Sequence, residues 1–209
     1  MTANYYGRSF FERAPDDVAR DLIGSLMIVR SKQRNLVARI VETEAYGGSD
    51  DPASHAYRGS TPRCAVMFGP AGVLYVYRSY GVHWCMNIVT GPEGLASAVL
   101  LRAAEVHVDE ERSPASVATT VLLSGPGNLT RGLGITGADD GADVCDVSRG
   151  RVTFQRARRP VGPGQIGQTE RVGITKGADR LSRFLLIDHP AVSPMRRRTG
   201  GVAAAKPSP

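Results

Sequence analysis

The segment from Val73 to Val89, VLYVYRSYGVHWCMNIV, constrains the fold more than any other part of the chain. It is dense in β-branched and aromatic residues, which pack well on a pleated sheet. Gly81 interrupts this pattern near its middle, so the segment predicts a β-hairpin with its tip near Tyr80 and Gly81. An isolated hairpin is barely stable in water, and further strands must therefore pair with this one.

Further strand candidates lie on both sides of the hairpin. Residues 25–30 (SLMIVR) and 35–44 (NLVARIVETE) are separated by the polar stretch SKQRN, which is typical of two strands joined by a turn. Residues 96–103, 151–157 and 183–188 are also runs of strand length. The sequence therefore predicts a protein whose core is built mainly on a sheet.

Helices are predicted to be few and short. Residues 15–23 begin with a proline and two aspartates, which favour a helix start, and their apolar residues share one face. Residues 61–68 begin with Thr-Pro, which favours the start of a short helix through RCAVMF. Residues 125–135 (GPGNLTRGLGI) predict a turn that leads into another short helix.

The remaining segments predict one domain with a long irregular loop. Residues 47–72 lack periodicity and are rich in Gly, Pro, Ser and Asp, and irregular segments of this length are often functional. Residues 105–120 give no clear signal. The 209 residues, 42% of them hydrophobic, suffice for one core, and the chain has no internal repeat. We therefore expect a single domain over residues 1–193 and a disordered basic tail over residues 194–209.

The charge of the chain points to a polyanionic partner. The formal net charge is +6 and the sequence pI is about 9.5. A basic surface favours nucleic acid first and an anionic membrane second. Three consecutive arginines, Arg196 to Arg198, contribute part of the excess from the tail. Because no run of about 18 apolar residues is present, we expect no membrane-spanning segment.

The cysteines predict reduced thiols rather than a disulfide framework. Cys64, Cys85 and Cys145 are few, odd in number and widely spaced. No CxxC or HxxxH pair offers the spacing of a zinc site, so no metal is expected. The N-terminal residues lack the apolar core of a signal peptide. These features predict a cytoplasmic protein.

Two acids end a predicted strand in the stretch RIVETEAYGG, which runs from Arg39 to Gly48. Glu42 and Glu44 are two residues apart and share a face of that strand. An acid pair of this kind usually lies on a solvated sheet face. Here the strand is otherwise apolar and opens into the long irregular loop, so one carboxylate is a candidate general base.

Aromatic and polar side chains near the hairpin suggest a recognition surface. Tyr75 and Trp84 are best explained by packing, whereas Tyr80 beside glycine at a hairpin tip predicts exposure. On a basic protein, an exposed tyrosine is a candidate wedge for the minor groove of DNA. His55 in the loop is either a structural histidine or a site residue. Arg102 ends a strand and needs water, a phosphate or a carboxylate as its partner.

These features together favour an enzyme that acts on a base taken out of the DNA stack. One alternative is a non-catalytic nucleic-acid-binding module on a related fold, but pure binding does not require Glu44 and Arg102. A second alternative is a hydrolase of free nucleosides, which would need neither the basic charge nor the wedge at Tyr80.

Seven blocks of the sequence carry a resemblance to a known family. RIVETEAY, the His55 loop, TPR…MF…G…LYVYRSYG, CMNI, VLLRA, LLSGPGNL and RVGI occur in the order and spacing of the alkyladenine DNA glycosylase family, the 3-methyladenine DNA glycosylases of eukaryotic type. The resemblance covers roughly Phe10 to Ile187. It implies a mixed α/β (α+β) single domain with a curved antiparallel β-sheet, short helices and a protruding β-hairpin.

The resemblance implies a monofunctional DNA repair enzyme that hydrolyses the N-glycosyl bond. Glu44 matches the family's general base, which activates a water. Arg102 and the backbone carbonyl of Val172 match groups that hold this water with Glu44. Glu42 has no catalytic counterpart, so Glu44 is the predicted base of the two opening acids. No metal or organic cofactor is implied.

The resemblance also implies a pocket for a flipped base. Tyr46 and Tyr77 match the aromatics that sandwich the base, and His55 lies on a third side. Asn87 matches a residue that disfavours the exocyclic amine of guanine. Tyr80 matches the residue that enters the minor groove and fills the gap left by the flipped nucleotide.

The implied partner is double-stranded DNA that contains alkylated or deaminated purines, with no membrane involved. We expect a monomer that is cytoplasmic and associated with the nucleoid. The chain departs from the family where ADRLSRF, residues 178–184, replaces an expected tryptophan before the last strand. Residues 105–120 are also hard to align. These departures affect peripheral DNA contacts rather than the catalytic set.

Overall fold

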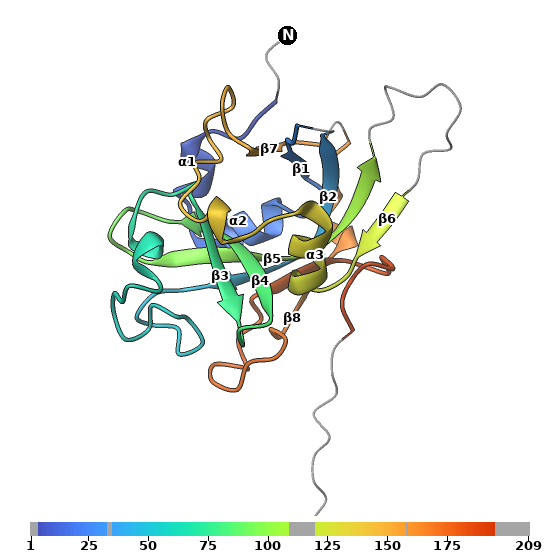
Figure 1. Ribbon diagram of the computed structural model, residues 1–209. Helices are drawn as coiled ribbons and strands as arrows, with labels where there is room; N and C mark the ends of the chain where they lie inside the picture. The colour runs from blue at the N-terminus through green and yellow to red at the C-terminus, as the bar shows by residue number, and fades with distance from the viewer. Residues whose placement is uncertain (1–3, 33–34, 109–119, 158, 195–209) are drawn as a thin grey trace, which may run out of the picture.

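The structure is a computed structural model that describes residues 4–32, 35–108, 120–157 and 159–194 (Figure 1). Within these ranges nine strands form one antiparallel sheet in the order β3-β4-β5-β2-β1-β7, with β6 beside β5, and β9 between β2 and β8. The strands are β1 (Leu26–Val29), β2 (Leu36–Tyr46), β3 (Leu74–Ser79), β4 (His83–Thr90), β5 (Ser97–Val108), β6 (Thr120–Leu123), β7 (Val152–Gln155), β8 (Ile166–Thr169) and β9 (Arg183–Leu186).

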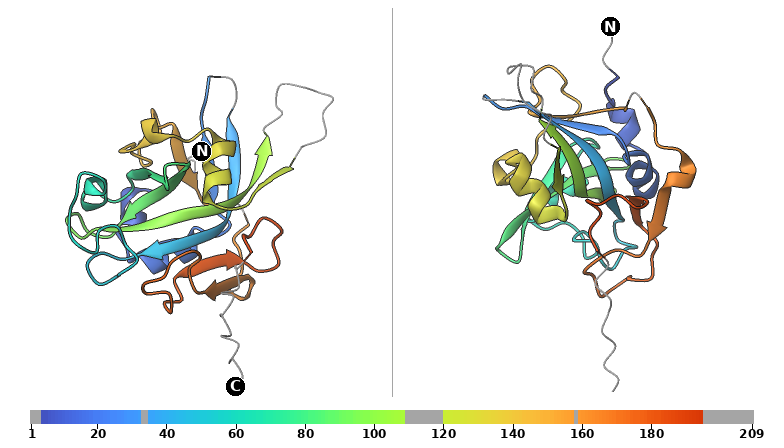
Figure 2. Two further views of the ribbon diagram at one scale, coloured as in Figure 1. Left: turned by 60° about the horizontal axis from the view of Figure 1, so that its bottom comes forward. Right: turned by 90° about the vertical axis from the view of Figure 1, so that its right-hand side faces the viewer.

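Short helices cover both faces of the curled sheet. Figure 2 shows α1 and α2 on one side of the sheet and α3 on the other. The helices are α1 (Arg8–Phe11), α2 (Pro15–Asp21) and α3 (Pro126–Leu133), with the 3-10 turns η1 (Ala65–Phe68), η2 (Gly137–Asp139) and η3 (Pro163–Gln165). In the described ranges, no helix is both long and apolar enough to cross a membrane.

Large apolar side chains fill the space between the sheet and the first two helices. Phe11 of α1 is fully buried and meets Phe154 of β7 edge to face, with ring centroids 6.1 Å apart. Leu22, Met27 and Phe184 are also buried in this cluster. Each such side chain stabilises the fold by roughly 1.5–3 kcal/mol relative to an exposed position. The core therefore fixes the central strands that carry the acids.

The two longest strands, β2 and β5, form the centre of the sheet. Their register shifts between Ile40 and Glu42 and again between Glu42 and Thr43, which marks a β-bulge beside the acids. Bulges bend a strand and re-aim its side chains, and they are common next to active sites. Glu42 and Glu44 are both fully buried, so the solvated-face interpretation of the acid pair is wrong.

Most of the predicted elements are confirmed. The expected fold, a mixed α/β protein with a curved antiparallel sheet and short helices, agrees with the structure. The hairpin is formed by β3 and β4, and the positive φ of both Tyr80 (49°) and Gly81 (68°) makes the turn at its tip. The helix predicted over residues 15–23 is α2, and the one predicted within residues 125–135 is α3.

One helix was placed wrongly, and several elements were missed. The predicted helix over residues 63–68 shrinks to the 3-10 turn η1, with Cys64 rather than Thr61 before it. The reason is local: the Thr61 hydroxyl lies 3.2 Å from the Cys64 sulfur instead of capping backbone N–H groups. No element was predicted within residues 105–120, but β5 ends and β6 begins there. The elements α1 and β8 were also not predicted. The predicted tail over residues 194–209 lies outside the described residues except for Pro194.

Candidate active site

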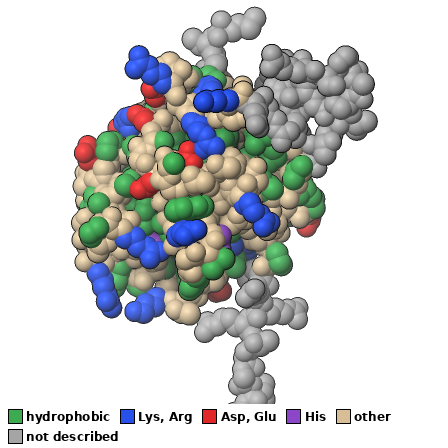
Figure 3. Space-filling view, in the orientation of Figure 1, with side chains coloured by type: hydrophobic (Ala, Val, Ile, Leu, Met, Phe, Trp, Pro, Cys, Tyr) green, Lys and Arg blue, Asp and Glu red, His purple; other side chains and the backbone are tan. Residues whose placement is uncertain are grey.

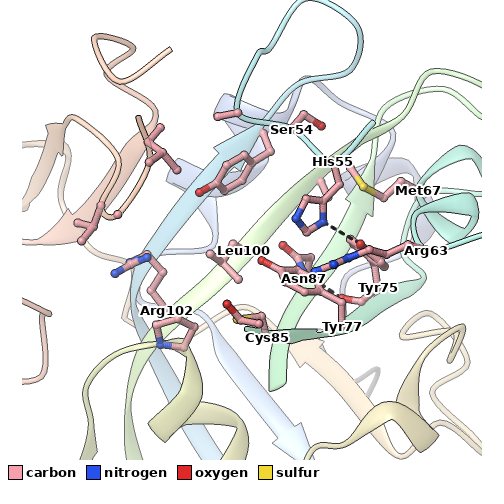
Figure 4. Close-up of a pocket in the computed structure, with 18 of the residues that line it drawn as sticks. Ser54, His55, Arg63, Met67, Tyr75, Tyr77, Cys85, Asn87, Leu100 and Arg102 are labelled. Carbon is pink, nitrogen blue, oxygen red and sulfur yellow. Dashed lines mark hydrogen bonds between the residues drawn. The ribbon is translucent and has the colours of Figure 1, made fainter. Parts of the chain in front are cut away.

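A cavity of about 610 Å³ opens between the irregular loop after β2, the β3–β4 hairpin and the loop after β8 (Figure 4). Its volume falls in the range typical of small-molecule pockets, ~300–1,000 Å³. Residues that are far apart in the sequence meet here because β2, β3, β4 and β5 are neighbours in the sheet. The predicted site residues in its wall are Tyr46, His55, Tyr77, Tyr80, Asn87, Arg102 and Val172.

Glu44 lies behind this wall, with no exposed surface. Its Oε1 accepts the backbone N–H of Val172 at 2.7 Å and lies 3.3 Å from Nη1 of Arg102. Its Oε2 accepts the hydroxyl of Tyr46 at 2.8 Å. The structure thus joins three predicted site residues to the predicted base, and Val172 contacts it through N–H.

Glu42 binds the opposite edge of the same arginine. Its Oε1 accepts Nε of Arg102 at 2.7 Å, Nε of Arg183 at 2.8 Å and the Ser193 hydroxyl at 2.7 Å, and its Oε2 accepts the Ser193 N–H at 2.7 Å. Burial alone would raise the pKa of Glu42, but Arg102, Ser193 and Arg183 together lower it. The structure therefore gives Glu42 a supporting role, since it holds Arg102 in place.

Arg102 is buried between the two carboxylates. Burial disfavours its charge, but Glu44 and then Glu42 raise the pKa of Arg102 above its ordinary value. Of the partners that the sequence left open for Arg102, the structure selects a carboxylate. A permanent cation beside Glu44 keeps that carboxylate in a fixed orientation.

The ring of Tyr46 forms one wall of the pocket and has a cation behind it. The guanidinium carbon of Arg171 lies 4.6 Å from the ring centroid. Arg171 is fully buried and binds both carboxylate oxygens of Asp51, at 2.5 and 2.9 Å. Burial, followed by the charge and hydrogen bonding of Glu44, raises the pKa of Tyr46 well above its usual value, so its hydroxyl stays protonated.

An aromatic cluster also lines the pocket. The ring centroids of His55 and Tyr77 are 4.5 Å apart, and those of Tyr75 and Tyr77 are 5.3 Å apart. Nδ1 of His55 lies 2.9 Å from the Tyr75 hydroxyl (Figure 4). Burial raises the pKa of Tyr75 to about 12, and burial and the charge of Arg63 lower the pKa of His55. A neutral His55 at neutral pH is the consequence.

Asn87 and Tyr80 both line the pocket, Asn87 from within β4 and Tyr80 from the hairpin tip. The buried Asn87 donates its side-chain amide to the carbonyl of Tyr75 at 3.0 Å, which fixes the direction of the amide at the pocket wall. Tyr80 is 92% exposed at the hairpin tip. Its neighbour Val82 is exposed as well. The tip therefore presents apolar surface to solvent at the mouth of the cavity.

Basic side chains are spread over the face that Figure 3 shows. Lys and Arg lie in both its upper and lower parts, whereas most acidic side chains in this view lie in the upper part, so the lower part, toward which the β3–β4 hairpin points in Figure 1, is mainly basic. Among the described residues no three His, Cys, Asp or Glu side chains gather closely enough to hold a metal ion. The three cysteines, all within the described ranges, are free thiols.

Sequence reasoning missed several side chains that support the site. Arg171 has no signal of its own within the RVGI block, and no motif marks Arg183 or Ser193. The only signal in the sequence was an arginine directly before an apolar run, as at Arg183. The carboxylate that pairs with it could not be identified without the fold. Arg63 belongs to the TPR motif, and the fold shows that it lines the cavity.

Comparisons with known proteins agree with this geometry. The methylpurine-DNA glycosylase family profile matches residues 9–190. A protein of Frankia casuarinae is 44% identical over 198 residues, covering 90% of this chain and 91% of its own. One of Methanoculleus marisnigri is 47% identical over 183 residues, covering 85% and 93%. Both relatives are provisionally named 3-methyladenine DNA glycosylases.

A curled antiparallel sheet that presents a buried acid beside an aromatic pocket fits an enzyme that acts on a nucleobase, and the match over most of the chain specifies which kind. The chain belongs to the methylpurine-DNA glycosylase family. It is a DNA glycosylase, an enzyme of base excision repair.

Proposed function

We propose that this protein flips alkylated or deaminated purines out of double-stranded DNA and hydrolyses their N-glycosidic bond, which leaves an abasic site. The proposed substrates are 3-methyladenine, 7-methylguanine, hypoxanthine and ethenoadenine. The observation that carries the proposal is the buried Glu44, which lies at the pocket wall and is fixed by Tyr46, Val172 and Arg102.

Base binding would begin at the hairpin tip. Tyr80 enters the minor groove and fills the space of the extruded nucleotide, since side chains wedged there unstack neighbouring bases. The flipped purine then enters the cavity and stacks between Tyr46 and Tyr77. Both rings have a raised pKa, so they remain neutral tyrosines rather than tyrosinates at physiological pH.

The hydrogen bonds around His55 suit it to read the base. The Tyr75 hydroxyl stays protonated and can donate a hydrogen bond to Nδ1 of His55. Nδ1 then carries no hydrogen, so the hydrogen of the neutral imidazole lies on Nε2. Nε2–H then serves as a donor to a purine nitrogen. Asn87 is held by the Tyr75 carbonyl and would select against the exocyclic amine of guanine.

The hydrolysis needs one water and one base. Two hydrogen bonds, from Tyr46 and Val172, and the ion pair with Arg102 already occupy Glu44, and a carboxylate offers about four lone-pair positions, so a position remains for a water. Because Glu44 has no exposed surface, admitting this water requires a small displacement of one donor, of which Arg102 at 3.3 Å is the loosest. The Val172 carbonyl would hold the same water.

The hydrolysis breaks the C1′–N bond and forms a C1′–O bond. The C1′–N bond breaks and its electron pair leaves with the purine, while the sugar gains oxocarbenium character that the Glu44 carboxylate stabilises. The water oxygen forms the new bond to C1′ and transfers its proton to Glu44. Arg102 stays protonated, transfers no proton in this scheme and only orients the carboxylate.

An excision assay tests the proposal. Duplex oligonucleotides with one hypoxanthine or one 7-methylguanine are incubated with the enzyme, and abasic sites are counted after alkaline cleavage. We expect abasic sites in lesion duplexes, none in undamaged duplexes and no release of base from free nucleosides. Binding without excision would instead favour a non-catalytic module, and hydrolysis of nucleosides alone would favour a nucleoside hydrolase.

A further inference from the structure

Arg63 places a positive charge in the wall of the base pocket. Its guanidinium carbon lies 5.3 Å from the ring centroid of Tyr77, and its Nη2 donates to the carbonyl of Arg78 at 3.2 Å. In Figure 4 the Arg63 side chain extends among Tyr75, Tyr77 and Asn87. It therefore lies against the aromatic surface on which a flipped base would stack.

The charge of Arg63 differs from that of the other arginines around the pocket because no carboxylate neutralises it. Arg102 pairs with Glu42 and Glu44, and Arg171 pairs with Asp51. Among the residues that the structure describes, no Asp or Glu forms an ion pair with Arg63. Its contacts are the Arg78 carbonyl, the face of the Tyr77 ring and a hydrogen bond with the Tyr75 side chain, all of which leave its charge intact.

The field of Arg63 already acts on its neighbours. Together with burial it lowers the pKa of His55, and it opposes the rise that burial imposes on the pKa of Tyr75. A second cation at His55 is thereby disfavoured. The same field must act on a charged base placed against Tyr77.

We propose that Arg63 is a specificity-determining residue that favours neutral purine lesions over cationic ones. This inference rests on the proposed function. Hypoxanthine and ethenoadenine enter the pocket uncharged, whereas 3-methyladenine and 7-methylguanine carry a positive charge in the nucleotide. A cationic base near an uncompensated guanidinium is repelled, and a neutral base is not.

Bond cleavage strengthens the distinction. When a neutral purine leaves, the electron pair of the C1′–N bond gives it negative charge, which the nearby guanidinium stabilises as it develops. When a cationic purine leaves, the same electron pair neutralises its charge, so Arg63 gives no such stabilisation. Arg63 donates no proton in either case. The side chain thus supplies electrostatic assistance for leaving groups that lack a charge of their own.

Arg63 is an exposed residue at the pocket wall, so the competing explanation is that it binds a DNA phosphate. A phosphate contact would strengthen binding to every duplex by a similar factor, whatever the lesion. A charge acting on the flipped base changes the ratio between lesions instead. The ratio of excision rates therefore separates the two explanations.

The experiment compares the parent with Arg63→Gln, Arg63→Lys and Arg78→Gln. Arg78 is the matched control, because it is an exposed arginine on the hairpin that carries Tyr77, lies 5.2 Å from the Trp84 ring centroid and is not part of the cavity wall. Single-turnover excision is measured on otherwise identical duplexes that contain hypoxanthine or 7-methylguanine. Thermal melting of each variant checks that the fold is intact.

We expect Arg63→Gln to lower the ratio of hypoxanthine to 7-methylguanine excision by about tenfold or more, the size of effect that one charge a few ångströms away can produce. Arg63→Lys keeps the charge and should stay near the parental ratio, as should Arg78→Gln. An unchanged ratio in Arg63→Gln, with both rates altered equally, would overturn the proposal. A parent enzyme that excises neither lesion would instead refute the proposed function.

Discussion

The hydroxyl of Tyr46 donates to Oε2 of Glu44 across 2.8 Å, although the two residues are separated by only one position on β2. Side chains two apart on a strand project from the same face, so this contact follows from the local geometry. It links the wall on which a base would stack to the carboxylate that would activate the water. A base that presses on Tyr46 therefore acts directly on a ligand of Glu44.

Tyr46→Phe should slow excision while leaving lesion binding nearly intact. The ring and its contact with Arg171 remain, but Glu44 loses one donor, and hydrogen bonds to charged groups contribute ~1.5–3 kcal/mol. Because burial and Glu44 raise the pKa of Tyr46, the hydroxyl stays protonated as the solution becomes mildly alkaline. The rate of the parent should therefore show no loss from this group up to about pH 10, its ordinary pKa.

The measurement is a pH profile of single-turnover excision for the parent and Tyr46→Phe, beside a binding titration. A parental profile that falls between neutral pH and pH 9, with a flat profile in Tyr46→Phe, would show that the hydroxyl ionises after all.

Glu44→Gln should bind lesion DNA about as well as the parent and excise it at least ~10²–10⁴-fold more slowly. Glutamine keeps the shape and can still accept the N–H of Val172, but it cannot take a proton from water. Single-turnover excision and a titration with lesion duplex measure the two effects. Parental excision by Glu44→Gln would end the case for this residue as the base.

Glu42→Gln should chiefly destabilise the fold. It leaves the buried Arg102 and Arg183 without a full countercharge, and breaking a buried ion pair typically costs ~3–5 kcal/mol. The pKa of Glu42 is lowered in the folded state, so its stabilisation is present above its unfolded pKa of about 4.3 and is lost as the pH falls through the folded value.

Urea unfolding of Glu42→Gln and the parent at pH 7 and at pH 3 measures this contribution. The difference between the two proteins should shrink at the lower pH. If Glu42→Gln is as stable as the parent but inactive, the roles of the two acids must be exchanged.

The sequence predicted the sheet and the position of Glu44 because these depend on local patterns. Alternating and β-branched residues define the hairpin, and an acid at the end of an apolar strand is visible without a structure. The resemblance then selected Glu44 rather than Glu42. The structure supplies the physical reason, since Glu42 is engaged by Arg102, Arg183 and Ser193, whereas Glu44 contacts residues that line the pocket.

The parts that could not be predicted depend on contacts between distant segments. Arg171 reaches Asp51 across 120 positions, and Ser193 reaches Glu42 across 151, so neither pair has a local signal. The helix expected after Thr61 failed because a side-chain contact with Cys64 replaced the cap. Arg63 belongs to a recognised motif, but only its distance to Tyr77 shows that its charge lies at the pocket.

Tyr80 allows stability and function to be separated at one position. Its φ of 49° lies in the left-handed region, where a side chain costs roughly 1–2 kcal/mol and glycine is unstrained. Because the side chain is 92% exposed, truncating it removes almost no packing. Tyr80→Gly should therefore be about 1 kcal/mol more stable than Tyr80→Ala.

Both variants should nevertheless lose the wedge to the same extent. Removing the ring should weaken the flipped complex by ~1–3 kcal/mol, the size of one lost aromatic–base stack. A fluorescent base analogue at the lesion reports flipping, and urea unfolding reports stability. Val82→Ala, one position beyond Gly81, shows how much a smaller apolar side chain at the same tip contributes. Full flipping by Tyr80→Gly and Tyr80→Ala would refute the wedge, because the exposed ring would then have no part in holding the base outside the helix.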